Sequence, residues 1–307
     1  MRWLGRLRGA KVPEWAAFFD GPEFERFVAA VEADAARRGW RITRVEDGMR
    51  VDGLDMEFGL SNLAQVCHAN PGDAWPAIVS QHFDNLVGAA AGDLEPPTAF
   101  EEARALLKVR IYPSDQPMVS DGGVVSSPLA PGLARVLVFD LPTTVATVPR
   151  DRLADWPPVD ELFAIATSNL RDEPAPSHEA VSLDSGGTID VHMGDSFFVA
   201  SRVLMLPEIA DLDGARGALV AFPHRHALLV HPIRDLAAIE AINLMVVLAD
   251  QWYREGPGSL SPTVHWWHDG ALTPILSEVR DRKVSVYPPD ALVEVLNGLE
   301  PPTPPVA

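Results

Sequence analysis

Residues 218–232 read Ala-Leu-Val-Ala-Phe-Pro-His-Arg-His-Ala-Leu-Leu-Val-His-Pro and close the densest core-forming stretch of the chain, which begins at Gly194. Two apolar runs with the composition of strands flank the polar segment Pro223–His226, which is typical of a turn. The sequence therefore predicts a central hairpin over 218–231, with a polar turn held on two buried strands.

The helices and strands expected around this hairpin come in clusters rather than in strict alternation. Helical spacing of apolar residues predicts helices over 20–39, 60–67, 73–86, 99–107, 159–170 and 235–255. Short or alternating apolar runs predict strands over 40–45, 49–51, 54–58, 109–112, 136–139, 144–148, 181–183, 189–191, 264–267 and 272–273. A further helix is expected from Gly194, broken at Pro207. Clustering of this kind is typical of the α+β class, so we expect mainly antiparallel sheet packed by helices.

The chain is expected to form two α+β modules in tandem, 13–107 and 108–300. Residues 114–132 are rich in glycine, serine and proline, which predicts an exposed loop. The proline-rich tail 301–307 is expected to be disordered. The clearest helix, 235–255, carries a continuous apolar stripe that we expect to be its buried side, made of Leu236, Ile239, Ile242, Val246, Ala249 and Tyr253.

Composition restricts the classes of partner. The 307 residues include 43 acidic and 25 basic side chains, a formal charge of −18. Such a field repels phosphate backbones and anionic lipid, so nucleic acid and membrane surfaces are not expected partners. No apolar run reaches the roughly 20 residues that span a bilayer. Cys67 is the single cysteine and lies on the apolar face of its helix, which predicts a buried, inert thiol and a reducing, cytoplasmic location.

Several short pieces of the sequence resemble a known family. They are Leu60-Ser61-Asn62-Leu63, Arg110-Ile111-Tyr112-Pro113, Trp156 with Asn169-Leu170, Ser201-Arg202-Val203-Leu204, Leu206-Pro207-Glu208 and Pro223-His224-Arg225. In this order they resemble the YtpQ-type family of bacterial proteins, a domain of unknown function. The resemblance implies a cytoplasmic bacterial α+β protein without an established activity, and it implies no catalytic residue. Where the family tends to have an aspartate after Pro-x-Arg, this chain has His226.

The positions that follow the family pattern, with the histidine after them, supply the candidate binding residues, which are Arg110, Tyr112, Arg202, Glu208, Arg225 and His226. We expect Arg110, Tyr112, Arg202 and Arg225 to converge on one side of the sheet, because each lies at a strand end or beside the central stretch. Arg202 stands between apolar neighbours, so it either forms an ion pair with Glu208 or Asp195 or binds a ligand carboxylate or phosphate.

The turn Pro223–His226 is where we expect function first, because a rigid support suits binding residues. Arg225 offers a planar, permanently charged fork suited to a carboxylate. If His226 replaces an acid that pairs with Arg225, the arginine is free for an outside partner. The alternative is that Arg225 pairs with another of the many carboxylates of the chain.

A metal site is the alternative chemistry of this turn. His224 and His226 are two residues apart, the spacing that places two side chains on one face of a strand. His268, His192 or Asp269 would supply a third ligand. Against this interpretation, histidines in a turn point into water. No cofactor is predicted from the other motifs, since the glycine pairs at 122–123 and 186–187 lack the lysine and helix start of a phosphate loop.

Three classes of function follow from these observations. The first, which we favour, is a non-enzymatic binding or protein-interaction module for a protein or a small anionic ligand. The second is a metal-assisted hydrolase built on His224 and His226. The third is a structural or assembly partner that acts through its acidic surface. Whether the protein is an enzyme stays open, and no feature of the sequence requires catalysis.

Overall fold

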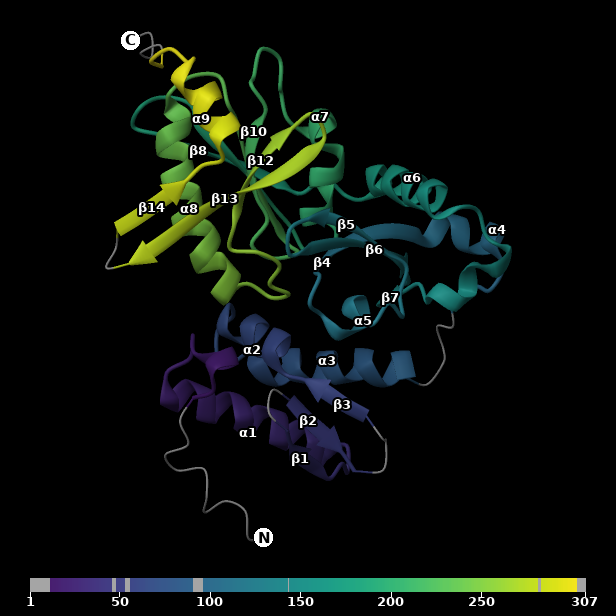
Figure 1. Cartoon of the computed structure of the whole chain (residues 1–307). Helices are drawn as coiled ribbons and strands as arrows, with labels where there is room; N and C mark the ends of the chain where they lie inside the picture. The colour runs from purple at the N-terminus through teal and green to yellow at the C-terminus, as the bar shows by residue number, and fades with distance from the viewer. Residues whose placement is uncertain are drawn as a thin grey trace. The chain divides into compact units, whose positions relative to one another are not determined.

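The computed structural model in Figure 1 describes residues 12–45, 48–52, 56–90, 96–142, 144–280 and 283–302. The chain divides into two compact units, Met1–Leu94 with Arg254–Gly258, and Glu95–Tyr253 with Ser259–Ala307. Each contains helices packed on antiparallel strands, which confirms the α+β class. This division lies after Leu94, whereas the sequence led us to expect a boundary after residue 107. The return of Arg254–Gly258 to the first unit also means that the units do not follow one another strictly in sequence.

The first unit is built on helices α1 (Gly21–Arg37), α2 (Ser61–His68) and α3 (Trp75–Ala90) and on the antiparallel strands β1 (Ile42–Arg44), β2 (Gly48–Val51) and β3 (Met56–Gly59), with a short 3-10 turn η1 (Glu14–Ala16) before them. Asp20 caps α1, and its side chain and that of Glu23 each accept a backbone N–H of the other residue. Cys67 is fully buried in this core, and burial raises its thiol pKa to about 12, as expected for an inert thiol.

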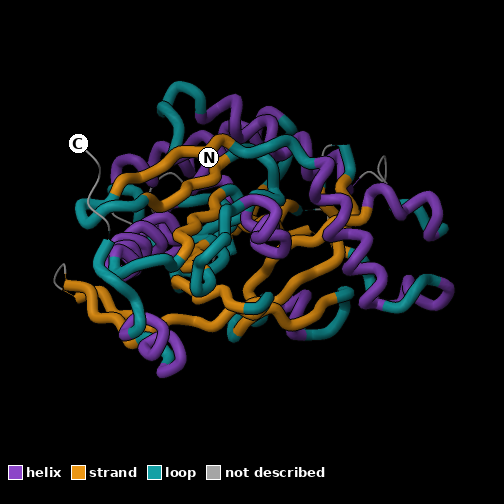
Figure 2. The backbone as a smooth tube through the Cα atoms, turned by 90° about the horizontal axis from the view of Figure 1, so that it is seen from above, coloured by secondary structure: helices purple, strands orange, loops and turns teal. Residues whose placement is uncertain are grey.

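The second unit contains a seven-stranded antiparallel sheet in the order β14-β13-β12-β10-β11-β9-β8. Its strands are β8 (Ser177–Ser182), β9 (Thr188–Met193), β10 (Ala218–Ala221), β11 (Ala227–Pro232), β12 (Val264–His268), β13 (Ala271–Arg280) and β14 (Lys283–Tyr287). The predicted central hairpin is confirmed: β10 and β11 pair with Ala218 opposite Pro232 and lie in the middle of the sheet. At its edge, β13 and β14 run side by side at the left of both views (Figures 1 and 2).

Side chains of the central strands alternate between two cores. Leu219, Ala221 and Leu229 pack against α8 (Ala237–Glu255) and α9 (Asp290–Asn297). The other face, with Val220 and Phe222, packs against the 3-10 segment η5 (Ala200–Met205) and α7 (Leu206–Ile209). Burial of both faces explains why these strands carry runs of consecutive apolar residues rather than alternate ones.

A smaller sheet of the same unit has the order β4-β6-β5, with β7 also paired to β6. Its strands are β4 (Leu107–Pro113), β5 (Ser126–Ala130), β6 (Leu133–Asp140) and β7 (Val145–Thr147), and α6 (Val159–Asn169) lies beside β5 and β6 in Figure 1. The helical turns α4 (Phe100–Ala103) and η2 (Arg104–Leu106) precede it, and η3 (Arg150–Asp155) and η4 (Leu170–Asp172) flank α6.

The expectation of an exposed loop over 114–132 is wrong. This segment forms a helical turn, α5 (Pro117–Ser120), and the paired strand β5. Val124 and Val125 are buried, so two apolar side chains and strand pairing outweigh the many glycine, serine and proline residues.

Three further expectations need correction. Ile239 is 49% exposed, whereas Ile242 is buried, because the buried side of α8 is centred on its alanines rather than on Ile239. Pro207 does not break a helix but stands in the first turn of α7, where its missing N–H costs nothing. Strand β14 and helix α9 were not expected at all. Most of the tail expected to be disordered, 303–307, lies outside the described residues.

Candidate functional site

Strand β4 aligns three polar side chains on one face, because Lys108, Arg110 and Tyr112 are spaced two apart. Opposite them runs the segment between β9 and η5, with Phe197 and Phe198. Lys108 lies over the Phe198 ring, its Nζ 5.0 Å from the centroid, and Arg110 lies over Phe197, its Cζ 5.6 Å from the centroid. The two cations therefore meet two consecutive aromatic rings.

Arg110 is a half-buried arginine without a counter-charge. Its guanidinium also lies 4.7 Å from the centre of the Tyr112 ring. Among the described residues, no carboxylate pairs with it, and its Nε is buried without a hydrogen-bond partner. Burial lowers the pKa of Arg110 below its ordinary value, so the folded protein bears the cost of a poorly solvated cation.

Arg225 comes to the same aromatic ring from the central hairpin turn. Its Cζ lies 5.0 Å from the centroid of Phe197, and its Nε donates a hydrogen bond of 2.9 Å to Nε2 of His226. Burial, and secondarily the positive charge of Arg110, lower the pKa of Arg225 to about 10. No carboxylate of the described residues pairs with Arg225, so the alternative of an internal ion pair is not realised.

His226 orients Arg225. Its Nδ1 lies 3.1 Å from the carbonyl oxygens of both Gly194 and Ser196, so this nitrogen carries the proton and donates it. Nε2 is then the acceptor that Arg225 requires. Burial, followed by the charge of Arg225, lowers the pKa of His226 to about 4, which keeps the ring neutral at pH 7. A histidine thus contacts the arginine without neutralising it.

A buried ionic network fixes the segment that carries Phe197. The ammonium of Lys108 binds Asp140 at 2.6 Å and also contacts Glu173. The second carboxylate oxygen of Glu173 accepts a hydrogen bond of 2.5 Å from the Ser196 hydroxyl. Ser196, which precedes Phe197, is therefore held by Glu173 through its hydroxyl and by His226 through its carbonyl oxygen.

Phe197 itself is 39% exposed, although it lies between two guanidinium groups. The arrangement presents two uncompensated cations beside an apolar ring. Guanidinium groups bind carboxylate and phosphate through paired N–H donors, and the ring offers a surface to the apolar part of the same ligand. The arrangement suits recognition of an anion.

Arg110, Tyr112 and Arg225 therefore converge, but from two different sheets rather than on one side of a single sheet. Arg202 does not join them. Its Nη2 donates to the carbonyl oxygens of Glu173 and Pro174 at 2.9 and 3.0 Å. The ion pair expected between Arg202 and Glu208 or Asp195 is not formed, because these carbonyls satisfy the buried guanidinium.

Glu208 is also absent from the group around Phe197. Both oxygens of its exposed carboxylate bind Arg171, at 2.7 and 2.6 Å. This bidentate pair fixes α7 against the end of α6, and it lowers the pKa of Glu208 below its ordinary value.

The histidines expected as metal ligands are not assembled. His268 follows Trp267, which pairs with Ala218 at the start of β10, whereas His224 follows the opposite end of β10, about 20 Å away at strand spacing. Both ring nitrogens of His226 are already hydrogen-bonded. Within the described residues, no group of three His, Cys, Asp or Glu side chains is placed to hold a metal ion.

His224 is buried in the turn rather than exposed to water. It is 5% exposed, its ring lies 6.4 Å from that of Trp252, and its Nδ1 accepts the backbone N–H of His226. Burial lowers its pKa to about 4. His224 is thus a neutral structural residue of the turn.

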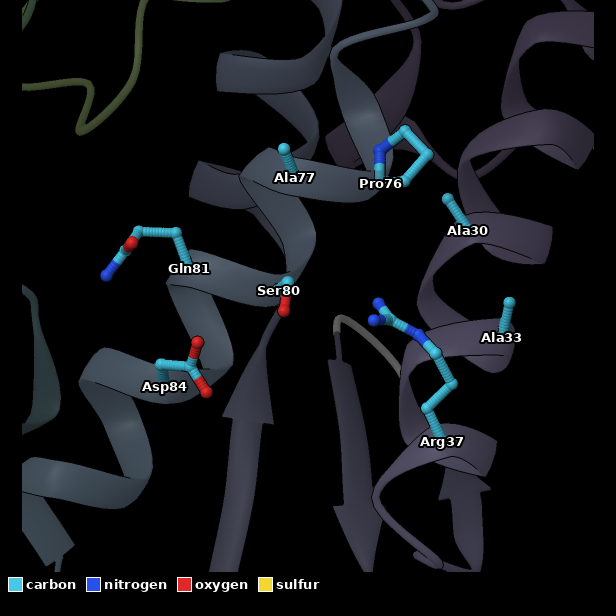
Figure 3. A pocket seen from close by; sticks show the side chains of 8 residues that line it. All are labelled: Ala30, Ala33, Arg37, Pro76, Ala77, Ser80, Gln81 and Asp84. Carbon is cyan, nitrogen blue, oxygen red and sulfur yellow. The ribbon is translucent and has the colours of Figure 1, made fainter.

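A surface cavity of the first unit has fewer groups that could recognise a ligand than the arrangement around Phe197 has. It has a volume of about 510 Å³ and lies between α1 and α3 (Figure 3). Two of the charged residues in its lining are compensated, since Arg37 binds Asp34 and Asp84 binds Arg38. Much of the rest of the lining is alanine and proline, so the cavity has few groups for specific recognition.

Sequence reasoning missed Phe197. Its only signal was the pair of adjacent aromatic residues in the central stretch, and which of the two is exposed depends on the backbone of the segment.

Comparison of the chain with family models, with curated proteins and with solved structures finds no match.

Proposed function

We propose that the chain is a non-enzymatic protein-interaction module that binds an acidic side chain or terminal carboxylate of a partner between Arg110 and Arg225. The observation that carries this proposal is the exposed ring of Phe197 between two arginines that no carboxylate of the described residues neutralises. Arginine and aromatic side chains are the residues most enriched where interfaces concentrate their binding energy.

The chain contains many carboxylates, yet no carboxylate of the described residues pairs with Arg110 or Arg225. It contains 43 acidic residues against 25 basic ones, and two other cations of low exposure do pair with carboxylates, Lys108 with Asp140 and Arg38 with Asp34. An unpaired, poorly solvated arginine costs stability, which a carboxylate from a partner recovers. This difference favours an outside anion over a purely structural role.

A protein partner fits better than nucleic acid or lipid. The net charge of −18 repels polyanions at long range, so a single carboxylate reaches the two arginines more readily than a phosphate backbone does. The exposed phenylalanine also suits an apolar residue next to that carboxylate. In keeping with the resemblance to YtpQ-type proteins, we place the protein in the bacterial cytoplasm, where the lone buried Cys67 stays reduced. No helix among the described residues is long and apolar enough to cross a membrane.

Photochemical cross-linking tests the proposal. Phe197→p-benzoylphenylalanine places the reactive group between the arginines, and cross-linked peptides from a cell lysate are identified by mass spectrometry. We expect cross-links within a few residues of Asp, Glu or a carboxyl terminus. Combining Arg110→Met with Arg225→Met should remove them. Arg171→Met is the matched control, because Arg171 is already bound by Glu208. Cross-links that persist in the double variant, or that ignore acidic residues, would reject the proposal.

A further inference from the structure

A groove lies on the other side of the small sheet. It has a volume of about 700 Å³ and lies in the second unit, where β5, α6, η5 and the turn between β12 and β13 meet. Its apolar lining includes Leu129, Phe163, Leu204, Trp267 and Leu272. This volume is within the range of pockets that hold small organic ligands.

Arg135 supplies the polar feature of the groove. It lies on β6 opposite Ile111, so its side chain leaves the face of the sheet away from Arg110 and Tyr112. Its guanidinium lies over the Phe163 ring, 4.4 Å from the centroid, and its Nη2 donates a long hydrogen bond of 3.4 Å to the Ser127 hydroxyl. Nε is buried without a hydrogen-bond partner, and no carboxylate of the described residues pairs with Arg135.

The other charges of the groove do not compensate Arg135. Arg171 is held by both oxygens of Glu208. Asp160 lines the groove from the start of α6 but forms no ion pair with Arg135. The groove therefore combines apolar side chains with one half-buried guanidinium that no carboxylate of the described residues neutralises.

We propose that this groove binds a small amphipathic carboxylate, such as a medium-chain aliphatic acid. The carboxylate accepts hydrogen bonds from Arg135, and the aliphatic chain lies against the half-buried Leu204 and Trp267. The pairing of charge selects an acid over an amine, because an ammonium would meet Arg135 with like charge. The site shares none of these residues with the group around Phe197, so it stands or falls independently of the proposed function.

Calorimetric titration with octanoate and with octylammonium, two probes of equal chain length and opposite charge, tests this site. Octanoate should bind and octylammonium should not. Because Trp267 lines the groove, octanoate should also change the tryptophan fluorescence of the protein, and Trp267→Phe should remove that change. Arg135→Met should weaken octanoate binding at least tenfold. Arg234→Met is the control, because Arg234 lies outside the groove and is already paired with Asp211, and it should leave octanoate binding unchanged.

A second variant guards against loss of folding in Arg135→Met. Ala164 lines the groove from an exposed position on α6, so Ala164→Trp fills the groove without disturbing the core. It should abolish octanoate binding while circular dichroism stays native. Equal binding of the two probes would overturn the proposal, as would unchanged octanoate affinity in Arg135→Met or Ala164→Trp.

Discussion

Lys108 and Arg110 lie two residues apart on one face of β4 and contact consecutive phenylalanines, yet only Lys108 has counter-charges. Lys108 is 8% exposed, and its ammonium binds Asp140 and Glu173. Arg110 has no carboxylate among the described residues, and burial lowers its pKa. The comparison separates scaffold from site: the lysine completes an internal network, whereas the arginine retains its affinity for an anion.

Removing the lysine gives the largest expected effect. Lys108→Met leaves two carboxylates, one of them buried, without their cation, and breaking a buried ionic network in this way costs about 3–5 kcal/mol. Urea denaturation should show this loss in the free energy of unfolding. A loss under about 1 kcal/mol would place the network on the surface rather than in the scaffold.

Truncation of a core side chain gives the loss in unfolding free energy that is expected of a purely structural residue. Ile242 of α8 is 3% exposed, so Ile242→Ala should cost about 2–5 kcal/mol. Ile239→Ala, on the exposed side of the same helix, should cost less than about 1 kcal/mol. Equal losses in urea denaturation would show that α8 is rotated from the orientation described here.

Acid should destabilise the fold through buried histidines. The pKa values of His224, His226 and His265 are each lowered to about 4, mainly by burial. Above pH 6.5 both folded and unfolded forms are neutral. Between pH 6.5 and 4 the unfolded chain takes up these protons first, so each histidine removes about 1.4 kcal/mol of stability per pH unit.

His226→Gln isolates the contribution of the residue that orients Arg225. The difference in unfolding free energy between the variant and the parent protein should change by about 1.4 kcal/mol per pH unit across this window. Above pH 6.5 this difference in unfolding free energy should not change with pH. A flat difference throughout the window would show that His226 is not buried in a neutral form.

The smallest effect is expected at the arginines. Arg110→Met should leave stability unchanged or raise it by up to about 2 kcal/mol, because it removes a poorly solvated charge without exposing a partner. Arg225→Ala should leave the melting temperature almost unchanged and weaken binding of a carboxylate partner. A stability loss from either substitution comparable to that of Lys108→Met would assign both arginines to the scaffold.

Sequence patterns predicted the elements around this site correctly where the pattern of buried residues is regular. The apolar runs beside Pro223–His226 predicted the central hairpin, and the helical spacing of apolar residues over 20–39 predicted α1. The patterns misled where packing reverses a local preference. Strand β5 forms within a segment rich in glycine and proline, because β6 offers it a pairing edge that local sequence does not reveal.

The site was only partly predictable. Arg110, Tyr112 and Arg225 were identified from the sequence, but their meeting on Phe197 depends on the packing of two sheets that no local pattern encodes. Arg202 and Glu208 were assigned to the same group, yet backbone carbonyls and Arg171 satisfy them instead. The sequence alone does not show which group will pair with a given charged residue in the folded protein.

The central claim is tested most directly at the guanidinium groups themselves. The Nε–H signals of Arg110, Arg225 and Arg171, assigned with methionine variants, are followed by nuclear magnetic resonance during titration with acetyl-Leu-Glu-Leu-amide or acetyl-Leu-Gln-Leu-amide. We predict that the glutamate peptide shifts the signals of Arg110 and Arg225 and leaves Arg171 unchanged. The glutamine peptide should shift none of them. Equal responses to both peptides, or none at Arg110 and Arg225, would contradict the account.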